Sequence, residues 1–181
     1  MSGLDNLTED VLARARRVRM LVFDVDGVLT DGSLFYDDRG EEYKAFNSRD
    51  GHGIKMLRAS GVETGIITGR TSQIVLHRSR NLGIGHIYQG AEDKLEAFHH
   101  LLEKTGLDPM QIAYMGDDVV DLPVMRRCGL AITVPDAPRE VKARCQVITL
   151  AHAGRGAARE ACELLMAVQG TWAAQLALYD R

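Results

Sequence analysis

The sequence predicts an α/β protein of three layers, in which helices cover both faces of a mainly parallel sheet. Short apolar runs of strand length alternate with longer segments of helical character, which is typical of such folds. The apolar runs are too short for helices and are consistent with buried strands. The 181 residues, of which 45% are hydrophobic, suffice for one domain with a full core.

The expected elements follow in a regular order. Thr8, with acidic residues after it, predicts a capped helix over 9–17. Residues 33–37 and 41–46, joined by a loop with Gly40, predict a β-hairpin. The other strands are expected at 20–25, 62–67, 84–88, 112–115, 130–133 and 147–149, and the other helices at 51–59, 72–82, 92–104, 119–127, 138–143, 157–168 and 171–179. Without a linker or internal repeat, we expect one domain over 1–181, with a hairpin insert at about 32–46 and a helical tail at about 154–181.

Composition excludes several classes of function. The net charge of −3 does not indicate a general surface for nucleic acid or anionic membranes. The apolar runs are far shorter than a membrane span, and residues 1–10 lack the pattern of a signal peptide. Three scattered cysteines favour reduced thiols over disulfides or a zinc site. We therefore expect a cytoplasmic protein with a small-molecule partner and with neither nucleic acid nor membrane as a partner.

The most unusual segment follows the first strand of the sheet. Its apolar residues lead into Asp24 and Asp26, and Gly27 comes next. If the strand geometry continues, both carboxylates point to one side, because side chains alternate along a strand. Two close carboxylates repel each other, and a divalent metal or a shared proton relieves that repulsion. Asp-Gly also favours a turn, so this segment alone supports a turn and an active site about equally.

Polar residues suited to metal and phosphate follow two later strands and begin a helix. They are Thr68-Gly69-Arg70, Gly116-Asp117-Asp118 and Lys94. In a parallel sheet the carboxyl ends of the strands share one crevice, where ligands bind. Carboxylates bind Mg²⁺, while hydroxyl, lysine and backbone N–H groups bind phosphate. Alone, these segments are typical of a turn, a helix cap and a solvated helix residue. Their joint occurrence favours magnesium-dependent phosphoryl chemistry.

The order Asp-x-Asp-Gly, Thr-Gly, Lys and Gly-Asp-Asp resembles that of the haloacid dehalogenase superfamily. Within it, the chain is similar to the family of 3-deoxy-D-manno-octulosonate 8-phosphate phosphatases. The similarity covers about residues 15–168 and rests on segments at 23–32, 47–53, 66–70, 116–125 and 154–160. It implies the Rossmann-like haloacid dehalogenase fold without a separate cap domain, and an enzyme that hydrolyses phosphate monoesters.

The resemblance implies a role for each site residue. Asp24 would be the nucleophile that forms an aspartyl-phosphate, and Asp26 would be the general acid and base. Asp24, Asp117 and the backbone carbonyl of Asp26 would hold Mg²⁺. Thr68 would hold the transferring phosphoryl group, and Lys94 would neutralise its charge and orient Asp24. Two more aspartates would support the metal site without binding the ion, namely Asp118 and Asp121.

The chain has no room for a cap domain, since only about 40 residues separate the Asp24 segment from Thr68. An uncapped site admits water and lacks specificity contacts. The resembling family assembles a homotetramer, in which hairpins and C-terminal segments of neighbours complete each site. The aromatic residues of the hairpin fit this expectation, because exposed apolar side chains favour burial by a partner. Packing of the hairpin on the chain's own helices is the alternative.

The resemblance also implies which residues contact the sugar acid. Arginine offers a bidentate fork to a carboxylate, and Arg70 directly follows Thr68-Gly69. Lys55 and Arg78 lie on expected helices, where a solvated face is the alternative. The full set of expected contacts comprises Asp26, Asn47, Ser48, Arg49, Asp50, Gly51, Lys55, Thr68, Gly69, Arg70, Arg78 and Lys94.

We therefore expect a Mg²⁺-dependent phosphatase that acts on 3-deoxy-D-manno-octulosonate 8-phosphate in the lipopolysaccharide biosynthesis of a Gram-negative bacterium. One alternative is a phosphatase for a nine-carbon acid sugar 9-phosphate. The alternative from another class is a catalytically silent interaction module of the same fold. The pair Asp24 and Asp26 argues against that module, because binding alone needs neither a nucleophile nor an acid.

Overall fold

The computed structural model of the chain describes residues 7–180. Its main sheet has six parallel strands in the order β5-β4-β1-β6-β7-β8. These strands are β1 (Met20–Phe23), β4 (Glu63–Ile67), β5 (His86–Tyr88), β6 (Ile112–Met115), β7 (Leu130–Thr133) and β8 (Val147–Ile148). The predicted parallel sheet is confirmed. The expectations about a signal peptide and about the ends of the domain fall partly on residues 1–6 and 181, outside the described residues.

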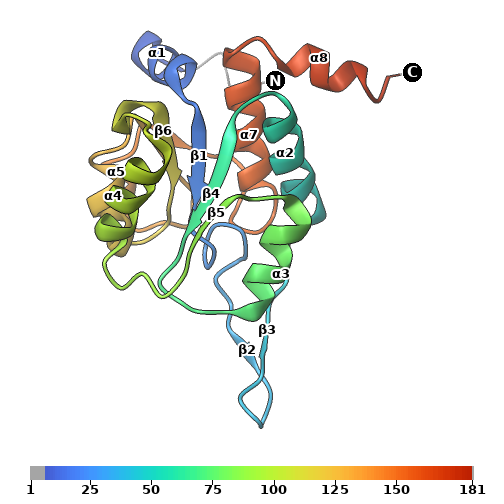
Figure 1. The fold of residues 1–181 in the computed structure, drawn as a ribbon, viewed down its shortest axis with the longest axis vertical. Coiled ribbons are helices and arrows are strands. Elements are labelled where there is room, and N and C mark those ends of the chain that lie inside the picture. Colours follow the sequence, from blue (N-terminus) through green and yellow to red (C-terminus); the bar gives the residue numbers. More distant parts are fainter. Residues whose placement is uncertain (1–6, 181) are drawn as a thin grey trace.

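Helices cover both faces of this sheet. They are α1 (Glu9–Arg17), α2 (Ser48–Ala59), α3 (Gln73–Leu82), α4 (Lys94–Thr105), α5 (Leu122–Met125), α6 (Arg139–Lys142), α7 (Ala157–Val168) and α8 (Trp172–Ala177). Figure 1 shows α4 and α5 on one side of the sheet and α2, α3 and α7 on the other. The predicted three layers are therefore confirmed. None of the helices within residues 7–180 is long and apolar enough to span a bilayer.

The centre of the sheet forms the core. All four residues of β1, and all four of β6, are buried. Phe23 and Tyr114 are among the largest fully buried side chains, together with Phe98 of α4. Burying side chains of this size stabilises the fold by roughly 1.5–3 kcal/mol each. The strand that leads to Asp24 is consequently held by packing on both faces and by neighbours on both edges.

A two-stranded antiparallel hairpin projects from the body of the molecule (Figure 1). It consists of β2 (Phe35–Tyr36) and β3 (Glu42–Tyr43), within the predicted insert at 32–46. Four of its apolar side chains, those of Leu34, Phe35, Tyr36 and Tyr43, are about half exposed. Within one chain the hairpin does not pack these side chains on its own helices, which removes that alternative for this group. Phe46, farther along, is partly buried against the core.

Several element boundaries differ from the prediction for local reasons. The first strand ends at Phe23 instead of residue 25. Helix α2 begins at Ser48 because the Asn47 side chain accepts hydrogen bonds from the N–H groups of the first turn. The predicted helix at 119–127 is confirmed only in part, since the chain forms a 3₁₀ turn, Val119–Asp121, followed by the short α5. Pro123 lacks an N–H group and is tolerated only in the first turn of a helix, so α5 starts beside it.

Candidate active site

The order of the strands brings the predicted site residues to one edge of the sheet. Strand β1 lies between β4 and β6, with Phe23 opposite Ile66 on one side and Met115 on the other. Asp24 therefore follows the middle strand, with Thr68 after β4 and Asp117 after β6. Thr68 is buried, and its backbone is bonded to Tyr88 and Ala91. The sequence-based prediction that these strand ends lie at one edge of the sheet is confirmed.

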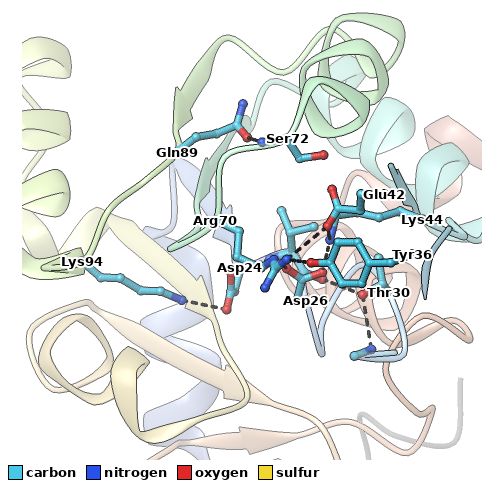
Figure 2. Close-up of polar contacts among 12 residues, drawn as sticks. Asp24, Asp26, Thr30, Tyr36, Glu42, Lys44, Arg70, Ser72, Gln89 and Lys94 are labelled. Atoms are coloured by element: carbon cyan, nitrogen blue, oxygen red, sulfur yellow. Dashed lines mark hydrogen bonds and ion pairs between the residues drawn. The ribbon is translucent and has the colours of Figure 1, made fainter. Parts of the chain in front are cut away.

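Lys94 forms ion pairs with two of the aspartates at this edge of the sheet. Its Nζ atom lies 2.7 Å from Asp24 Oδ2 and 2.6 Å from Asp121 Oδ1. All three side chains are buried, and Figure 2 shows the lysine reaching from α4 to Asp24. Burial alone would lower the pKa of Lys94, but the charges of Asp24 and Asp121 outweigh it and raise that pKa. The ammonium group therefore remains charged beside the nucleophile candidate.

Asp121 organises the turn that carries Asp117. Its Oδ2 atom accepts hydrogen bonds from the N–H groups of Asp117 and Asp118, and its Oδ1 atom also accepts one from the Tyr114 hydroxyl. Gly116 leaves room for this arrangement, because a Cβ atom there would lie 2.4 Å from Asp121 Cγ. Asp118 is exposed and caps the 3₁₀ turn through Val119 N–H. These contacts agree with a supporting role for Asp121 and with a capping role for Asp118.

Three acidic residues at this edge of the sheet form a group that could hold a cation. Carboxylate oxygens of Asp24, Asp117 and Asp121 lie within 4.8 Å of one another. Asp117 Oδ1 is buried without a hydrogen-bond partner among the described residues. Gly27 lies against the same carboxyl group, where a Cβ atom would be 2.0 Å from Asp117 Oδ2. A buried carboxylate oxygen without a donor is costly, so a hard divalent cation fits this group.

The raised pKa values of Asp24 and Asp117 also indicate that a cation would stabilise their ionised forms. Burial raises the pKa of Asp24 to about 6, Asp121 adds to the increase, and Lys94 opposes it. Burial raises the pKa of Asp117 to about 7, and the charges of Asp121 and Asp24 contribute. Neighbouring carboxylates without a metal disfavour each other's charged form. A bound divalent cation would reverse this effect by favouring the carboxylates.

Asp26 faces a different part of the molecule. Beyond Phe23 the chain turns, and the N–H groups of Val28, Leu29 and Thr30 all bond to Val25 O. The condition for placing both aspartates on one side, a continued strand, is therefore not met. The Asp26 carboxylate is not part of the acidic group described above. Its Oδ1 atom instead lies 2.5 Å from Nζ of Lys44, a residue of the hairpin segment.

Lys44 is the centre of an ionic network that the sequence-based prediction missed. Its Nζ atom also lies 3.0 Å from Glu42 Oε1. Arg70 approaches the same acids, with Nε 3.8 Å from Asp26 Oδ2 and Nη2 3.6 Å from Glu42 Oε1. The Tyr36 hydroxyl accepts a hydrogen bond from Arg70, as Figure 2 shows, and the guanidinium carbon lies 5.8 Å from the centre of the Tyr36 ring. Two cations, Lys44 and Arg70, and one further acid, Glu42, thus surround the predicted proton donor Asp26.

A weak sequence signal for this network exists. Glu42 and Lys44 are two residues apart in a predicted strand, so they face the same side and carry opposite charges. Their pairing with Asp26, 18 residues before Lys44, depends on how the hairpin folds back over the end of β1. Burial alone would lower the pKa of Lys44, but hydrogen bonds to Asp26 and Glu42 outweigh it, so its pKa is raised.

The predicted substrate segment from Asn47 to Gly51 divides into structural and exposed residues. Asn47 caps α2, while both carboxylate oxygens of Asp50 accept hydrogen bonds from the start of the α7 region, at 3.2 Å from Gly156 N and 2.8 Å from Arg159 N. The Asp50 carboxylate is thus engaged within the chain, which gives it a structural role that we did not predict. Gly51 is buried, whereas Ser48, Arg49 and Lys55 are exposed.

The two predicted arginines differ in their surroundings. Arg78 is half-buried and donates from Nη2 to the Asn47 carbonyl oxygen at 3.3 Å, with its guanidinium carbon 5.7 Å from the centre of the Phe46 ring. A Cβ atom on Gly51 would lie 2.2 Å from Arg78 Nη2, so the absence of a side chain at residue 51 leaves room for the Arg78 guanidinium group. Arg70 is exposed, follows the exposed Gly69, and lies beside Asp26 with Nε 3.8 Å from Oδ2. Arg70 is therefore the better placed of the two for contact with a ligand.

Comparison with known proteins assigns this arrangement to a family. A family of haloacid dehalogenase-like hydrolases matches residues 78–160. The 3-deoxy-D-manno-octulosonate 8-phosphate phosphatase of Escherichia coli is 48% identical over 164 residues, which cover 91% of this chain and 87% of that protein. The chain belongs to the octulosonate 8-phosphate phosphatase family. Members of this phosphatase family are phosphoric monoester hydrolases of the haloacid dehalogenase superfamily.

The similarity of this octulosonate phosphatase family member to solved structures extends over nearly the whole chain. A probable phosphatase from Pseudomonas syringae is 48% identical, with a TM-score of 0.94 over 96% of this chain and 99% of that one. The octulosonate 8-phosphate phosphatase of Moraxella catarrhalis is 40% identical, with a TM-score of 0.93 over 95% and 99% of the two chains. That structure is a complex with a magnesium ion, a phosphate ion and an octulosonate molecule. The haloacid dehalogenase fold of the present chain is thereby confirmed.

Proposed function

We propose that this protein is a Mg²⁺-dependent phosphatase that hydrolyses 3-deoxy-D-manno-octulosonate 8-phosphate through an aspartyl-phosphate. The observation that carries the proposal is the environment of Asp24, which is buried beside Lys94 and shares an acidic group with Asp117. A nucleophilic carboxylate must be held ionised and close to cations that bind the phosphoryl oxygens. Membership of the octulosonate phosphatase family supports the choice of substrate.

In the first half of the reaction, an Asp24 carboxylate oxygen attacks phosphorus and the bond from phosphorus to the sugar oxygen breaks. Asp26 donates its proton to that oxygen, so the sugar leaves as a neutral alcohol. Lys94 and the Thr68 region stabilise charge on the phosphoryl oxygens. When bound by Asp24, Asp117 and the Asp26 carbonyl, Mg²⁺ would supply charge neutralisation for the same oxygens.

In the second half, Asp26 is the base. It removes a proton from the water that attacks the aspartyl-phosphate, and the bond between phosphorus and Asp24 breaks. Inorganic phosphate leaves, while Asp24 is again a carboxylate and Asp26 is again protonated. Both half-reactions require two carboxyl groups, one that acts as the nucleophile and one that carries a proton beside the leaving oxygen. Asp24 and Asp26 suit these separate roles because they contact different cations, Lys94 and Lys44 respectively.

We propose that recognition of the sugar acid uses Arg70, together with Arg78, Lys55 and the segment from Asn47 to Gly51. Arg70 is suited to a carboxylate because its guanidinium group is planar and forked. We further propose a homotetramer whose neighbouring chains complete the site, since the exposed apolar hairpin side chains favour burial by a partner. The reaction would then belong to lipopolysaccharide biosynthesis in the cytoplasm of a Gram-negative bacterium.

The test is release of inorganic phosphate from purified octulosonate 8-phosphate, measured with Mg²⁺ and after chelation, beside a nine-carbon acid sugar 9-phosphate. We expect turnover that requires Mg²⁺ and prefers the eight-carbon substrate. Substantial turnover in chelator would contradict the metal requirement, and a preference for nine carbons would contradict the substrate. Absence of turnover on every acid sugar phosphate would favour the silent module. Light scattering on the same sample tests the tetramer.

A further inference from the structure

The hairpin places a buried ammonium group against the predicted proton donor. The Lys44 side chain is only 2% exposed, although it comes from a projecting hairpin whose strands have two residues each. Burial of an ammonium group is costly unless acids compensate it. Asp26 and Glu42 are the acids that contact it. This lysine therefore connects the hairpin to the catalytic carboxyl group and has no other ionic partner among the described residues.

Lys44 contacts only one of the two oxygens of Asp26. It donates to Oδ1 at 2.5 Å, while none of the described residues donates a hydrogen bond to Oδ2. Arg70 is the other cation nearby, but its Nε atom is 3.8 Å from Oδ2, beyond hydrogen-bond distance, and its side chain is 43% exposed. The orientation of the carboxyl group thus depends on Lys44, and Oδ2 is the oxygen that remains available for proton exchange.

We propose that Lys44, held by Glu42, is a positioning residue that orients the Asp26 carboxyl group toward the leaving-group oxygen. The inference rests on the proposed role of Asp26 as the general acid, but it does not depend on which sugar is the substrate. Proton transfer needs the acid within hydrogen-bond reach of the oxygen that receives the proton. A small rotation of Asp26 would therefore slow cleavage of esters whose leaving group needs that proton.

Two substrates with different leaving groups distinguish this role of Lys44 from a purely structural one, which would affect both substrates equally. Phenoxide is a poor leaving group and needs a proton, whereas p-nitrophenoxide is a good one and needs little assistance. The value of kcat/KM reports only the steps through release of the alcohol, so hydrolysis of the aspartyl-phosphate does not contribute. Neither ester carries the sugar acid's carboxylate, which separates positioning of Asp26 from binding of the substrate.

We expect Lys44→Ala to lower kcat/KM for phenyl phosphate by about 100-fold and for p-nitrophenyl phosphate by at most about fivefold. Lys44→Arg should restore much of the loss on phenyl phosphate, because it keeps a cationic donor. The matched control is Lys104→Ala, an exposed lysine at the end of α4. Its kcat/KM values should remain those of the wild type for both esters.

Equal losses on the two esters, or no loss on either, would overturn the proposal. Glu42→Gln keeps the shape of the hairpin if Lys44→Ala does not fold, and it should produce the same selectivity with a smaller loss of a fewfold. An equal effect of Glu42→Gln on both esters would likewise overturn it. A wild type that hydrolyses both aryl esters but not octulosonate 8-phosphate would contradict the proposed substrate and leave this test valid.

Discussion

Asp24 and Asp26 are two residues apart, yet they belong to regions built in different ways. Asp24, Lys94 and Asp121 form a buried cluster between the central strands and α4, and Asp121 has no exposed surface. Asp26, Lys44 and Glu42 form a network under a projecting hairpin, and Arg70 at its edge is largely exposed. In the proposed mechanism the core cluster acts on the phosphoryl group, which all substrates of such enzymes share. The hairpin network acts on the leaving group, which differs between substrates.

The two halves of the site should therefore contribute differently to the free energy of unfolding. A charge in the core cluster is surrounded by packed side chains, so removal of its partner leaves an unpaired buried charge. In the hairpin network Lys44 is buried, but its partners Asp26 and Glu42 are partly exposed and Arg70 is exposed, so water can reach a charge that loses its partner and the cost in folding free energy is lower. Substitutions in the core cluster should therefore change both rate and stability, whereas those in the network should mainly change rate.

The largest expected effect on rate comes from Asp24, the proposed nucleophile. Asp24→Asn should lower kcat by at least about 1,000-fold, because a carboxamide cannot form the aspartyl-phosphate. The fold should persist, since asparagine keeps the size of the side chain and Lys94 retains Asp121. Phosphate release with Mg²⁺ and thermal unfolding are the measurements. Rates near those of the wild type would show that Asp24 is not the nucleophile.

Lys94→Met should show the link between rate and stability in the core cluster. Loss of the ammonium group leaves Asp24 and Asp121 buried without it, which should lower the free energy of unfolding by about 3 kcal/mol. Turnover should also fall by about 100-fold or more. Urea unfolding without metal gives the first quantity, and Lys104→Met is the matched control. A loss of stability below about 1 kcal/mol would contradict the comparison of the two regions.

The metal-free protein should lose stability as the pH rises. In the folded state the pKa of Asp24 is about 6 and that of Asp117 about 7, both above the ordinary value of 3.8. A raised pKa means that the fold favours the protonated form, so this contribution is complete below about pH 4 and is lost as the pH passes 6 to 7. We expect a loss of roughly 1–3 kcal/mol between pH 5 and 8 in chelator.

Thermal unfolding in chelator and in Mg²⁺ checks this expectation. Mg²⁺ should remove most of the loss above pH 7, because it binds the ionised carboxylates. Asp117→Asn should make the stability of the metal-free protein less dependent on pH. If the metal-free protein became more stable from pH 5 to 8, the crowding of carboxylates around Asp117 would have no energetic consequence.

The smallest effect on stability is expected at the edge of the hairpin network. Arg70→Ala should change the free energy of unfolding by less than about 0.5 kcal/mol, because Arg70 is exposed and its ion pairs are long. It should lower kcat/KM about tenfold for octulosonate 8-phosphate, and less for p-nitrophenyl phosphate, which has no sugar carboxylate. Arg17→Ala, an exposed arginine at the end of α1, is the control. Equal losses on the two substrates would argue against carboxylate recognition.

Much of the fold could be predicted from local patterns. All six strands of the sheet lie within about two residues of their expected positions, because continuous apolar runs of strand length are typical of buried parallel strands. The helix expected at 119–127 is confirmed only in part, because the capping by Asp118 and the position of Pro123 favour a 3₁₀ turn followed by a short helix there. Hydrophobic periodicity does not contain that information, since the two effects depend on one side-chain hydrogen bond of Asp118 and on the missing N–H group of Pro123.

The candidate site was predictable where it depends on the sheet and unpredictable where it depends on the hairpin. Asp24, Thr68 and Asp117 follow neighbouring parallel strands, and such strand ends must share one edge. The contact of Lys44 with Asp26 follows from no such rule. The use of Asp50 to hold the start of α7, more than 100 residues later, also follows from none.

By itself, the sequence determined the parallel α/β architecture, the identity of the acidic residues and lysine at the strand ends, and the family. Periodicity and motif spacing are local properties, and they suffice because parallel strands place their ends together. Only the tertiary structure decided that Asp24 and Asp26 face different cations, and that Lys44 lies buried against the second of them. The physical reason is that pairing of charges depends on where the turn after Phe23 and the returning hairpin place them in space.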